Sequence, residues 1–242
     1  MIVKGKNEKP LVIEKSTHVV CAPSSRAILF DTTAKTTTID VKPHAEIFYI
    51  SWNKKMKKAI VGKEATIHWI ELCTTDVKTE TILAGKKAHA RFLTLSIGKN
   101  MHISVHNTVL HQAKETTSEI IMFSTLKQST SFLRGTTIIE KHASGIAHQN
   151  FQTILLDENS HASALPEMFI STADVQASHH ASAGQIKPET VFYMMSRGID
   201  ETTAQRIVTQ SHITALLHQY PLEVQHILYD LLQKKCGENY EH

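Results

Sequence analysis

The chain has 242 residues, 41% of them hydrophobic and 20% charged, which is the balance of an ordinary globular protein. The formal net charge is only +3, from 26 basic and 23 acidic side chains without a long basic stripe, so we expect no nucleic-acid partner. No apolar run approaches the roughly 20 residues that cross a bilayer, and the N-terminus lacks the apolar core of a signal peptide, so we expect neither a membrane span nor secretion.

Three cysteines, Cys21, Cys73 and Cys236, lie far apart in the chain. An odd number of separated cysteines argues against a disulfide framework, so we predict a reducing, cytoplasmic location. Cys73 falls in an apolar run and is interpreted as a small core residue. Cys236 is assigned no role.

The predicted elements begin with strands. Short apolar or β-branched runs recur between residues 11 and 171, several of them alternate with a period of two, and threonine is abundant. The runs predicted as strands are residues 27–30, 45–52, 66–72, 91–97, 102–110, 119–126, 131–139 and 152–156.

The densest basic cluster consists of Lys54, Lys55, Lys57 and Lys58, with Lys63 shortly after. A charge run of this kind is usually a solvated face. We therefore interpret the cluster as a solvated loop rather than as a phosphate-binding patch.

The connections between the predicted strands are unusual for hairpins. The chain contains no Asn-Gly or Asp-Gly, and only nine glycines and six prolines. Two-residue hairpins favour those dipeptides, whereas a solenoid that steps from coil to coil needs fewer such turns. The spacing of roughly 10–14 residues between runs fits either a β-helix or a jelly roll, so periodicity alone leaves both open.

The pattern becomes helical after residue 187. Pro188 suits a first helical position and Gly198 suits a C-terminal cap. Asp200 is predicted to cap a second helix over residues 201–218, and Pro221 opens a third segment. The third segment carries an apolar stripe at helical spacing, formed by Val224, Ile227, Leu228 and Leu231. We expect these short helices to pack on the β region, on a partner, or on both.

Sixteen histidines raise the alternative of a small metal-dependent jelly-roll (cupin-like) enzyme. Its candidate ligands are His142, His148, His161 and His179. Against it, these histidines form no His-x-His pair within one strand, and no acidic residue falls at a clear ligand spacing beside them. A carbohydrate-active β-helix would need paired carboxylates in a groove, and few acidic residues cluster in that way.

The segment 164–198 reads ALPEMFISTADVQASHHASAGQIKPETVFYMMSRG and resembles the signature of the SufB/SufD family. The residues that carry the resemblance are Pro166, Asp174, Val175, Ser178, His179, Ala181, Gly184, Phe192, Tyr193, Ser196, Arg197, Gly198 and Ile199. Upstream, the residues that resemble the family's preceding coils are Phe132, Arg134, Gly135, Ala147, Gln149, Leu155 and Leu156. The detailed match covers residues 132–203, and a looser strand-rich match covers most of what precedes it.

The resemblance implies a mainly β protein, with a right-handed parallel β-helix over residues 1–186 and a small C-terminal α-helical domain over residues 187–242. Family members are non-catalytic scaffolds for iron–sulfur cluster assembly. They pair through the end of the β-helix, and the helical domain docks SufC, an ABC-type ATPase. Full-length members are longer and begin with a helical domain, so this chain resembles a shortened member.

The resemblance also implies site residues. His179 matches the proposed cluster ligand of SufD-type subunits, whereas His180 departs from the glycine of SufD-type and the glutamate of SufB-type chains. Ser160 stands where SufB-type chains place an essential cysteine, and Ala177 where many SufD-type chains have one. Since thiolates receive sulfur and hold iron, Ser160 and Ala177 argue against a SufB-like role as direct sulfur acceptor.

His179, and His180 as a further candidate, would then contribute to a transient iron–sulfur cluster shared with a SufB-like subunit or with a second copy of the chain. No cofactor is expected to bind tightly to this chain alone. The partner-docking candidates on the motif helix are Phe192, Tyr193, Met195, Arg197 and Gly198. In a local alternative, His179 merely caps a turn where the β-helix ends, with Ser178 bonded to the backbone.

Overall fold

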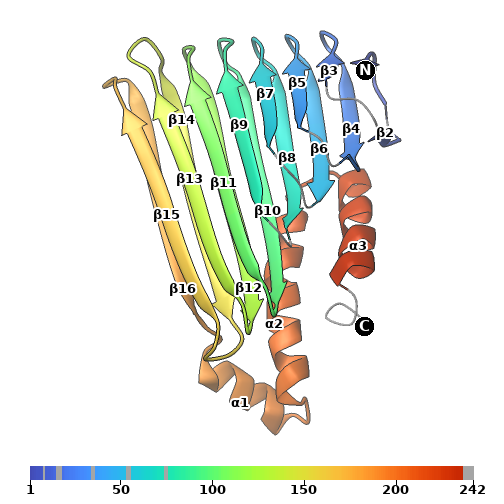
Figure 1. The fold of residues 1–242 in the computed structure, drawn as a ribbon, viewed down its shortest axis with the longest axis vertical. Coiled ribbons are helices and arrows are strands. Elements are labelled where there is room, and N and C mark those ends of the chain that lie inside the picture. The colour runs from blue at the N-terminus through green and yellow to red at the C-terminus, as the bar shows by residue number, and fades with distance from the viewer. Residues whose placement is uncertain (8, 15–17, 34–35, 53–55, 74–75, 237–242) are drawn as a thin grey trace.

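The computed structural model describes residues 1–7, 9–14, 18–33, 36–52, 56–73 and 76–236, without the side chains of residues 73, 235 and 236. Within these ranges, sixteen strands precede three helices (Figure 1). The strands are β1 (Ile2–Val3), β2 (Leu11–Ile13), β3 (His18–Cys21), β4 (Arg26–Asp31), β5 (Thr37–Val41), β6 (Glu46–Trp52), β7 (Lys57–Val61), β8 (Thr66–Cys73), β9 (Val77–Leu83), β10 (His89–Lys99), β11 (His102–His111), β12 (Thr116–Lys127), β13 (Thr130–Ile139), β14 (Gly145–Leu155), β15 (His161–Ile170) and β16 (Val175–Gln185). The helices are α1 (Pro188–Ser196), α2 (Glu201–Leu217) and α3 (Leu222–Cys236).

The strands form two eight-stranded sheets that the chain visits alternately. The odd-numbered strands make one sheet and the even-numbered strands the other, in sequence order. All strand pairs described in these sheets are parallel. Each odd and even pair is therefore one coil of a stack. A jelly roll is built from antiparallel strands, so this topology does not favour the jelly-roll alternative.

One corner of the stack repeats a left-handed backbone conformation. Its residues have φ between 53° and 61° although they are not glycines; they are Ser24, His44, Glu64, Lys87 and Glu115. The amide groups of the first four donate to a carbonyl group of the next coil at 2.9–3.1 Å. These hydrogen bonds offset the conformational cost of positive φ, which explains how the coils turn with so few glycines.

The core between the sheets is made by the side chains that alternate inward. Tyr49, Trp69 and Phe92 occupy the same register on β6, β8 and β10 and are fully buried. Their rings contact one another with centroids 4.7 Å and 6.1 Å apart. Parallel in-register pairing places equivalent residues above one another, so these three aromatic side chains form a row across three consecutive coils.

Two of the helices cover the outer face of the even-numbered sheet (Figure 1). Helix residues such as Leu217 and Leu228 share a buried cluster with outward-facing strand residues such as Phe48, Leu93 and Phe123. α1 has no buried residue. The expectation that the helices pack on the β region is confirmed for α2 and α3. No helix in the described ranges is long and apolar enough to span a bilayer.

The eight runs predicted as strands are confirmed by β4, β6, β8, β10, β11, β12, β13 and β14. Several further strands went unpredicted because their sequences are short or polar; β7, for example, begins with two lysines, and β16 is made largely of alanine, serine and histidine. The predicted caps are confirmed. Asp200 accepts a hydrogen bond from the Thr203 amide at 3.0 Å, and Gly198 follows α1 with φ +87°.

The interpretation of the lysine cluster as a solvated loop is wrong for Lys57. This side chain points between the sheets from β7, is 1% exposed, and donates to Asp31. Lys58 is half-buried with 42% of its side chain exposed, Lys63 is exposed, and Lys54 and Lys55 lie outside the described residues.

Cys21 is buried in the core, and its burial raises the pKa of its thiol to about 12. The side chains of Cys73 and Cys236 are not among those described. The interpretation of Cys73 as a small core residue therefore stays a prediction.

Candidate functional site

The last coil of the stack, β15 and β16, forms an open end. Each of these strands pairs with only one neighbour among the described strands, β13 and β14 respectively. All residues of β16 after Val175 are exposed. Unpaired backbone N–H and C=O groups along a sheet edge are a ready template for another chain.

His179 and His180 lie in the middle of β16 and point to opposite faces of the sheet. His179 is in register with Gln149, which is 2% exposed and faces the interior of the stack. His180 is in register with Asn150, on the exposed outer face. Since successive strand residues alternate in direction, the two imidazoles of one chain are not placed to ligate one ion together.

The neighbours of His179 on the inner face of β16 have small side chains. By the same register, the inward positions around it on β16 include Ala177, Ala181 and Ala183. Below it, Gln149 Nε2 donates to Thr137 Oγ1 at 2.8 Å and to the Glu167 carbonyl at 3.1 Å. Gln149 Oε1 is buried and has no hydrogen-bond partner in the described part of the chain. The residue paired with His179 on the previous coil therefore carries a buried acceptor without a partner, and His179 itself is exposed at the end of the stack.

The alternative in which His179 caps a turn is wrong, because the residue lies within a strand. Ser178 faces outward and its hydroxyl contacts His148 Nδ1 at 2.7 Å, so it is not engaged with the backbone as that reading supposed. His148 in turn lies on the outer face of β14, away from the inward-facing imidazole.

The four histidines of the metal-enzyme alternative are not brought together. His142 lies in the turn after β13, His148 and His161 lie on outward positions of β14 and β15, and only His179 faces the interior. Within the described ranges no three His, Cys, Asp or Glu side chains are grouped so as to hold a metal ion.

Other groups occupy the two positions at which the sequence resemblance implies thiols in related chains. The Ser160 hydroxyl is buried in a turn and donates to Asp157 Oδ1 at 2.8 Å. Ala177 is exposed on the inner face of β16. At this end the chain therefore offers an imidazole ligand but no thiolate at either position.

Sequence reasoning missed Glu167, which links the last coil to the one before it. Arg134 of the family motif forms two hydrogen bonds to the Glu167 carboxylate, at 2.7 Å and 3.1 Å, and Thr136 adds a third at 2.9 Å. The Arg134 guanidinium lowers the pKa of Glu167 below its usual range. The signal that could have revealed this ion pair is the position of an acidic residue, Glu167, one coil after the motif residue Arg134.

A second candidate surface is α1 with its surroundings. Phe192, Tyr193 and Met195 are exposed by 74%, 60% and 49% of their surfaces. The Arg197 guanidinium lies 5.4 Å from the centroid of the Tyr193 ring, and the Gly198 amide donates to the Met195 carbonyl at 3.0 Å. Exposed apolar groups concentrated on one short helix mark an interaction surface.

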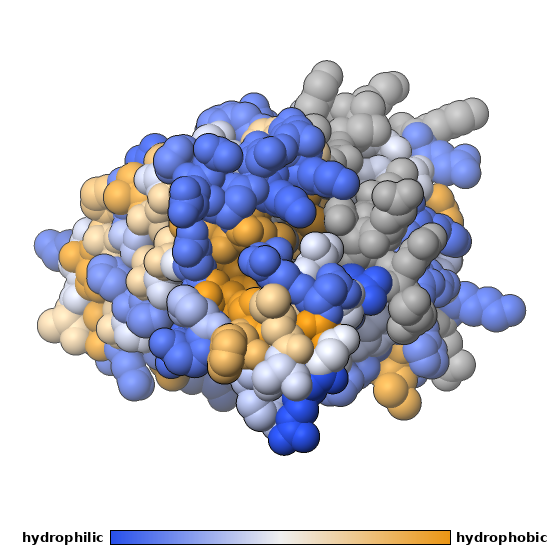
Figure 2. All heavy atoms as spheres, turned by 90° about the horizontal axis from the view of Figure 1, so that it is seen from below, coloured by the Kyte–Doolittle hydropathy of each residue, from blue (hydrophilic) through white to orange (hydrophobic). Residues whose placement is uncertain are grey.

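Beside α1 lies a hollow of about 500 Å³ that is both apolar and acidic. Its lining includes Phe192 and Met195 together with the carboxylates of Asp157, Glu158 and Glu201. Figure 2 views this end of the molecule and shows hydrophobic residues exposed among hydrophilic ones. A partner that combined apolar and basic side chains would complement it.

Comparison with known proteins gives one consistent result. The family model described as "SUF system FeS cluster assembly, SufBD core domain" matches residues 2–212. The chain is 28% identical to the iron–sulfur cluster assembly protein SufD of Bacillus subtilis over 182 residues, which cover 72% of this chain and 42% of that protein. It is 27% identical to SufB of the same organism over 180 residues, 71% of this chain and 38% of that one.

A SufBD family protein of Mycobacterium leprae is 27% identical over 201 residues, which are 76% of this chain and 23% of that protein. The chain thus spans less than half the length of these curated relatives. The family match, in contrast, extends from the first strand into α2. The chain therefore belongs to the SufB/SufD family of the SUF system for iron–sulfur cluster assembly, through its SufBD core domain.

Proposed function

We propose that this chain is a SufD-like, non-catalytic scaffold subunit of a SUF-type iron–sulfur cluster assembly complex. The observation that carries the proposal is the exposed imidazole of His179 at the unpaired end of the stack, in a chain with Ser160 and Ala177 at the thiol positions. One imidazole is an incomplete iron site, because iron–sulfur clusters are held mainly by thiolates. An iron–sulfur cluster that is assembled here and then passed on would need further ligands from a second chain.

The stack is proposed to be a right-handed parallel β-helix. Consecutive strands alternate between two parallel sheets, and each strand pairs with the one two positions later. Crossover connections between parallel strands are right-handed in nearly all proteins, because of the twist of the strands. In this arrangement residues 1–186 form the β-helix and residues 187–242 the helical part.

The open end suits pairing with another subunit. β16 contains no lysine, proline or acidic residue, so it lacks the side chains that commonly protect an edge strand. β15 adds three exposed apolar side chains, Leu165, Phe169 and Ile170. The partner would be a SufB-like subunit that supplies cysteine and glutamate, or a second copy that supplies its own His179. Such a complex would work in a reducing compartment, the cytoplasm.

We expect His179→Ala to lower the iron retained by the assembled complex about tenfold, because the substitution removes a first ligand at the proposed interface. The chain would be co-expressed with a SufB-like subunit and a SufC-like ATPase of the same organism. Iron and sulfide would then be measured in the purified complex. The free energy of unfolding of the isolated chain should change by less than about 0.5 kcal/mol, since the side chain is exposed.

His180→Ala is the matched control, because the adjacent residue has the same side chain on the opposite face of β16. It should retain the iron content of the unmodified complex. Equal iron in the His179→Ala complex would refute the proposed role of this imidazole. Loss of iron with His180→Ala alone would assign the ligand to the outer face instead.

The exposed face of α1 is proposed to dock a SufC-like ABC ATPase. Phe192, Tyr193 and Met195 would supply apolar contacts, and Arg197 with Gly198 would shape the helix end. Removing everything from Pro188 onward would also strip α2 and α3 from the sheet and expose its outer face. Point variants therefore test docking better than truncation does.

We expect Phe192→Ser combined with Met195→Ser to reduce co-purification of the ATPase by about tenfold or more, because exposed aromatic anchors dominate interface energies. Leu222→Ser is the control: Leu222 is 68% exposed at the start of α3, close to the 74% of Phe192. Undiminished capture by the α1 variant, or an equal loss with Leu222→Ser, would contradict docking at α1.

A further inference from the structure

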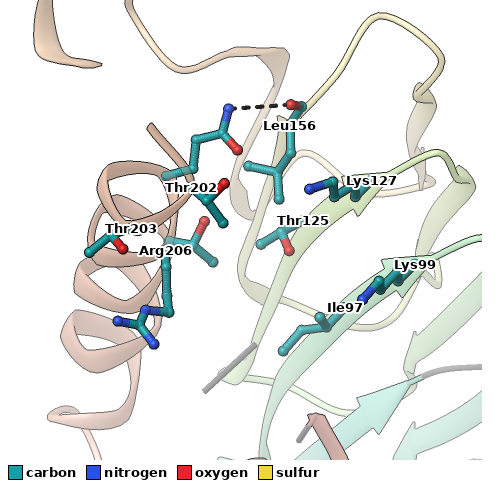
Figure 3. Close-up of a pocket in the computed structure, with 11 residues that line it drawn as sticks. Ile97, Lys99, Thr125, Lys127, Leu156, Thr202, Thr203 and Arg206 are labelled. Atoms are coloured by element: carbon teal, nitrogen blue, oxygen red, sulfur yellow. Dashed lines mark hydrogen bonds between the residues drawn. The ribbon is translucent and has the colours of Figure 1, made fainter. Parts of the chain in front are cut away.

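A second cavity adjoins the hollow beside α1, with which it shares Leu156 and Gln205 in its lining. It has a volume of about 180 Å³ and lies between the N-terminal half of α2 and the carboxyl ends of β10 and β12 (Figure 3). Ile97 and Leu156 provide apolar surface, and the Gln205 side chain donates to the Leu156 carbonyl at 3.4 Å. The other polar residues that line the cavity are Lys99, Lys127, Arg206, Thr125, Thr202, Thr203 and Thr209.

The lining of this cavity is cationic. It includes two lysines and an arginine, and no carboxylate among the described residues. Lys99 and Lys127 are in register on adjacent parallel strands, so their side chains lie next to each other on the outer face of the sheet. Figure 3 shows both side chains extending from the strands toward α2. Like charges placed directly opposite each other are destabilising unless an anion compensates them.

The acidic residue that follows β14 is already engaged. Asp157 accepts hydrogen bonds from the Gln128 amide at 2.7 Å, from the Asn159 amide at 3.1 Å and from the Ser160 hydroxyl at 2.8 Å. No ion pair links either lysine to a carboxylate in the ranges that the structure covers. Burial by itself would raise the pKa of Asp157, but these hydrogen bonds, together with the charge of Lys127, lower it. Because neither ammonium group is held in a direct ion pair among the described residues, both can also contact an anion from solution.

A buried hydroxyl group adds an independent sign of a ligand. Thr209 lines the cavity from α2, is only 8% exposed, and its Oγ1 has no hydrogen-bond partner in the described part of the chain. Leaving a buried hydroxyl unpaired costs about 1–3 kcal/mol, so native structures rarely do so without a reason. A ligand oxygen in the cavity would satisfy it.

We propose that this cavity binds a phosphoryl group, with Lys99, Lys127 and Arg206 neutralising its charge and Thr209 donating a hydrogen bond. Several cations and hydroxyl donors around one small space match the charge and the oxygen acceptors of phosphate better than those of a singly charged carboxylate. Pockets for drug-sized ligands measure about 300–1,000 Å³, so this cavity suits inorganic phosphate or the phosphoryl end of a larger molecule that extends into solvent. The inference does not depend on the proposed scaffold function.

The test is titration of the full chain with inorganic phosphate and with ribose 5-phosphate, by isothermal calorimetry at low ionic strength. We expect saturable binding of at least one, weakened about tenfold by Lys99→Gln or Lys127→Gln. Thr209→Val keeps the shape of the side chain and should weaken binding several-fold. Lys78→Gln, which removes an exposed strand lysine from the other sheet, should leave binding unchanged.

The two ligands distinguish the source of the phosphoryl group. Tighter binding of ribose 5-phosphate supports a phosphorylated metabolite, and equal or tighter binding of inorganic phosphate supports the free ion. Absence of saturable binding of either ligand would overturn the proposal. So would affinities that Lys99→Gln and Lys127→Gln leave unchanged, or that Lys78→Gln lowers by the same factor.

Discussion

Replacing Lys57 by methionine should lower the free energy of unfolding by about 3–5 kcal/mol, because the substitution leaves the Asp31 carboxylate buried without its countercharge. Asp31 accepts hydrogen bonds from Lys57, from Tyr49, from the Thr33 amide at 2.7 Å and from the Thr37 hydroxyl at 2.9 Å. All of these residues are buried between the sheets.

The pKa values in this cluster agree with an ionised Asp31. Burial by itself would raise the pKa of the Asp31 carboxyl, but hydrogen bonds from Lys57, Tyr49 and Thr33 lower it below its usual range. Burial, together with the charge of Asp31, raises the pKa of the Tyr49 phenol well above its ordinary value. The phenol is therefore a donor to a carboxylate whose charge is balanced by Lys57.

The neighbouring Lys58 provides the control with the same substitution. Its Nζ lies 3.3 Å from Glu80 Oε1 and its side chain is 42% exposed, so Lys58→Met should cost less than about 1 kcal/mol. Urea unfolding followed by circular dichroism measures both variants. Asp31→Asn combined with Lys57→Met should recover most of the lost stability, because no unpaired buried charge remains. Equal losses for the two lysine variants would contradict the buried ion pair.

Glu71→Gln should stabilise the protein at pH 8 by a few kcal/mol while leaving its stability near pH 4.5 almost unchanged. Glu71 lies on β8 between the sheets, and neither carboxyl oxygen has a hydrogen-bond partner among the described residues. Burial raises the pKa of this carboxyl from 4.5 to about 8, against the opposing effect of the Lys57 charge.

The direction of the pH effect follows from proton binding. Between pH 4.5 and about 8 the folded protein keeps the Glu71 proton that the unfolded chain has released. Stability therefore falls as the pH rises through this window, by up to about 1.4 kcal/mol per pH unit from this group. Glutamine has no proton to lose, so the variant lacks this contribution.

The measurement is the free energy of unfolding from urea titrations of both proteins between pH 4.5 and 8.5. The difference between variant and unmodified protein isolates the contribution of Glu71, because every other ionisable group is present in both proteins. Glu158→Gln, at an exposed turn, should give a curve parallel to that of the unmodified protein. A constant difference between Glu71→Gln and the unmodified protein would show that Glu71 does not titrate in this range.

Features that depend on a short stretch of chain were predicted from the sequence. The apolar runs became strands, and Pro188, Gly198 and Asp200 mark the ends of helices as predicted. The scarcity of glycine and the absence of hairpin dipeptides correctly allowed a stack of coils as one of the predicted folds. In the structure, residues other than glycine adopt positive φ at the corners of the coils. These signals are local, because propensity, capping and turn conformation are decided within a few residues.

β16 is an element that local sequence signals do not predict. Its alanines, serines and histidines have little strand propensity, so the sequence did not predict it as a strand; eleven consecutive pairings with β14 hold it in place. The sequence, through the family motif, singled out His179 and His180. Only the register with Gln149 and Asn150 decided that one imidazole faces the interior and the other faces solvent.

The sequence by itself determined the strand-rich and helical regions, the helix caps, and the motif that marks the family. The tertiary structure decided that Lys57 is buried while Lys58 is half-buried, that α2 and α3 cover a sheet while α1 stays uncovered, and that a cationic cavity forms beside α2. The reason is physical: burial and facing depend on which strands pair and in which register. Those pairings join residues about 20–30 positions apart, beyond the reach of any local pattern.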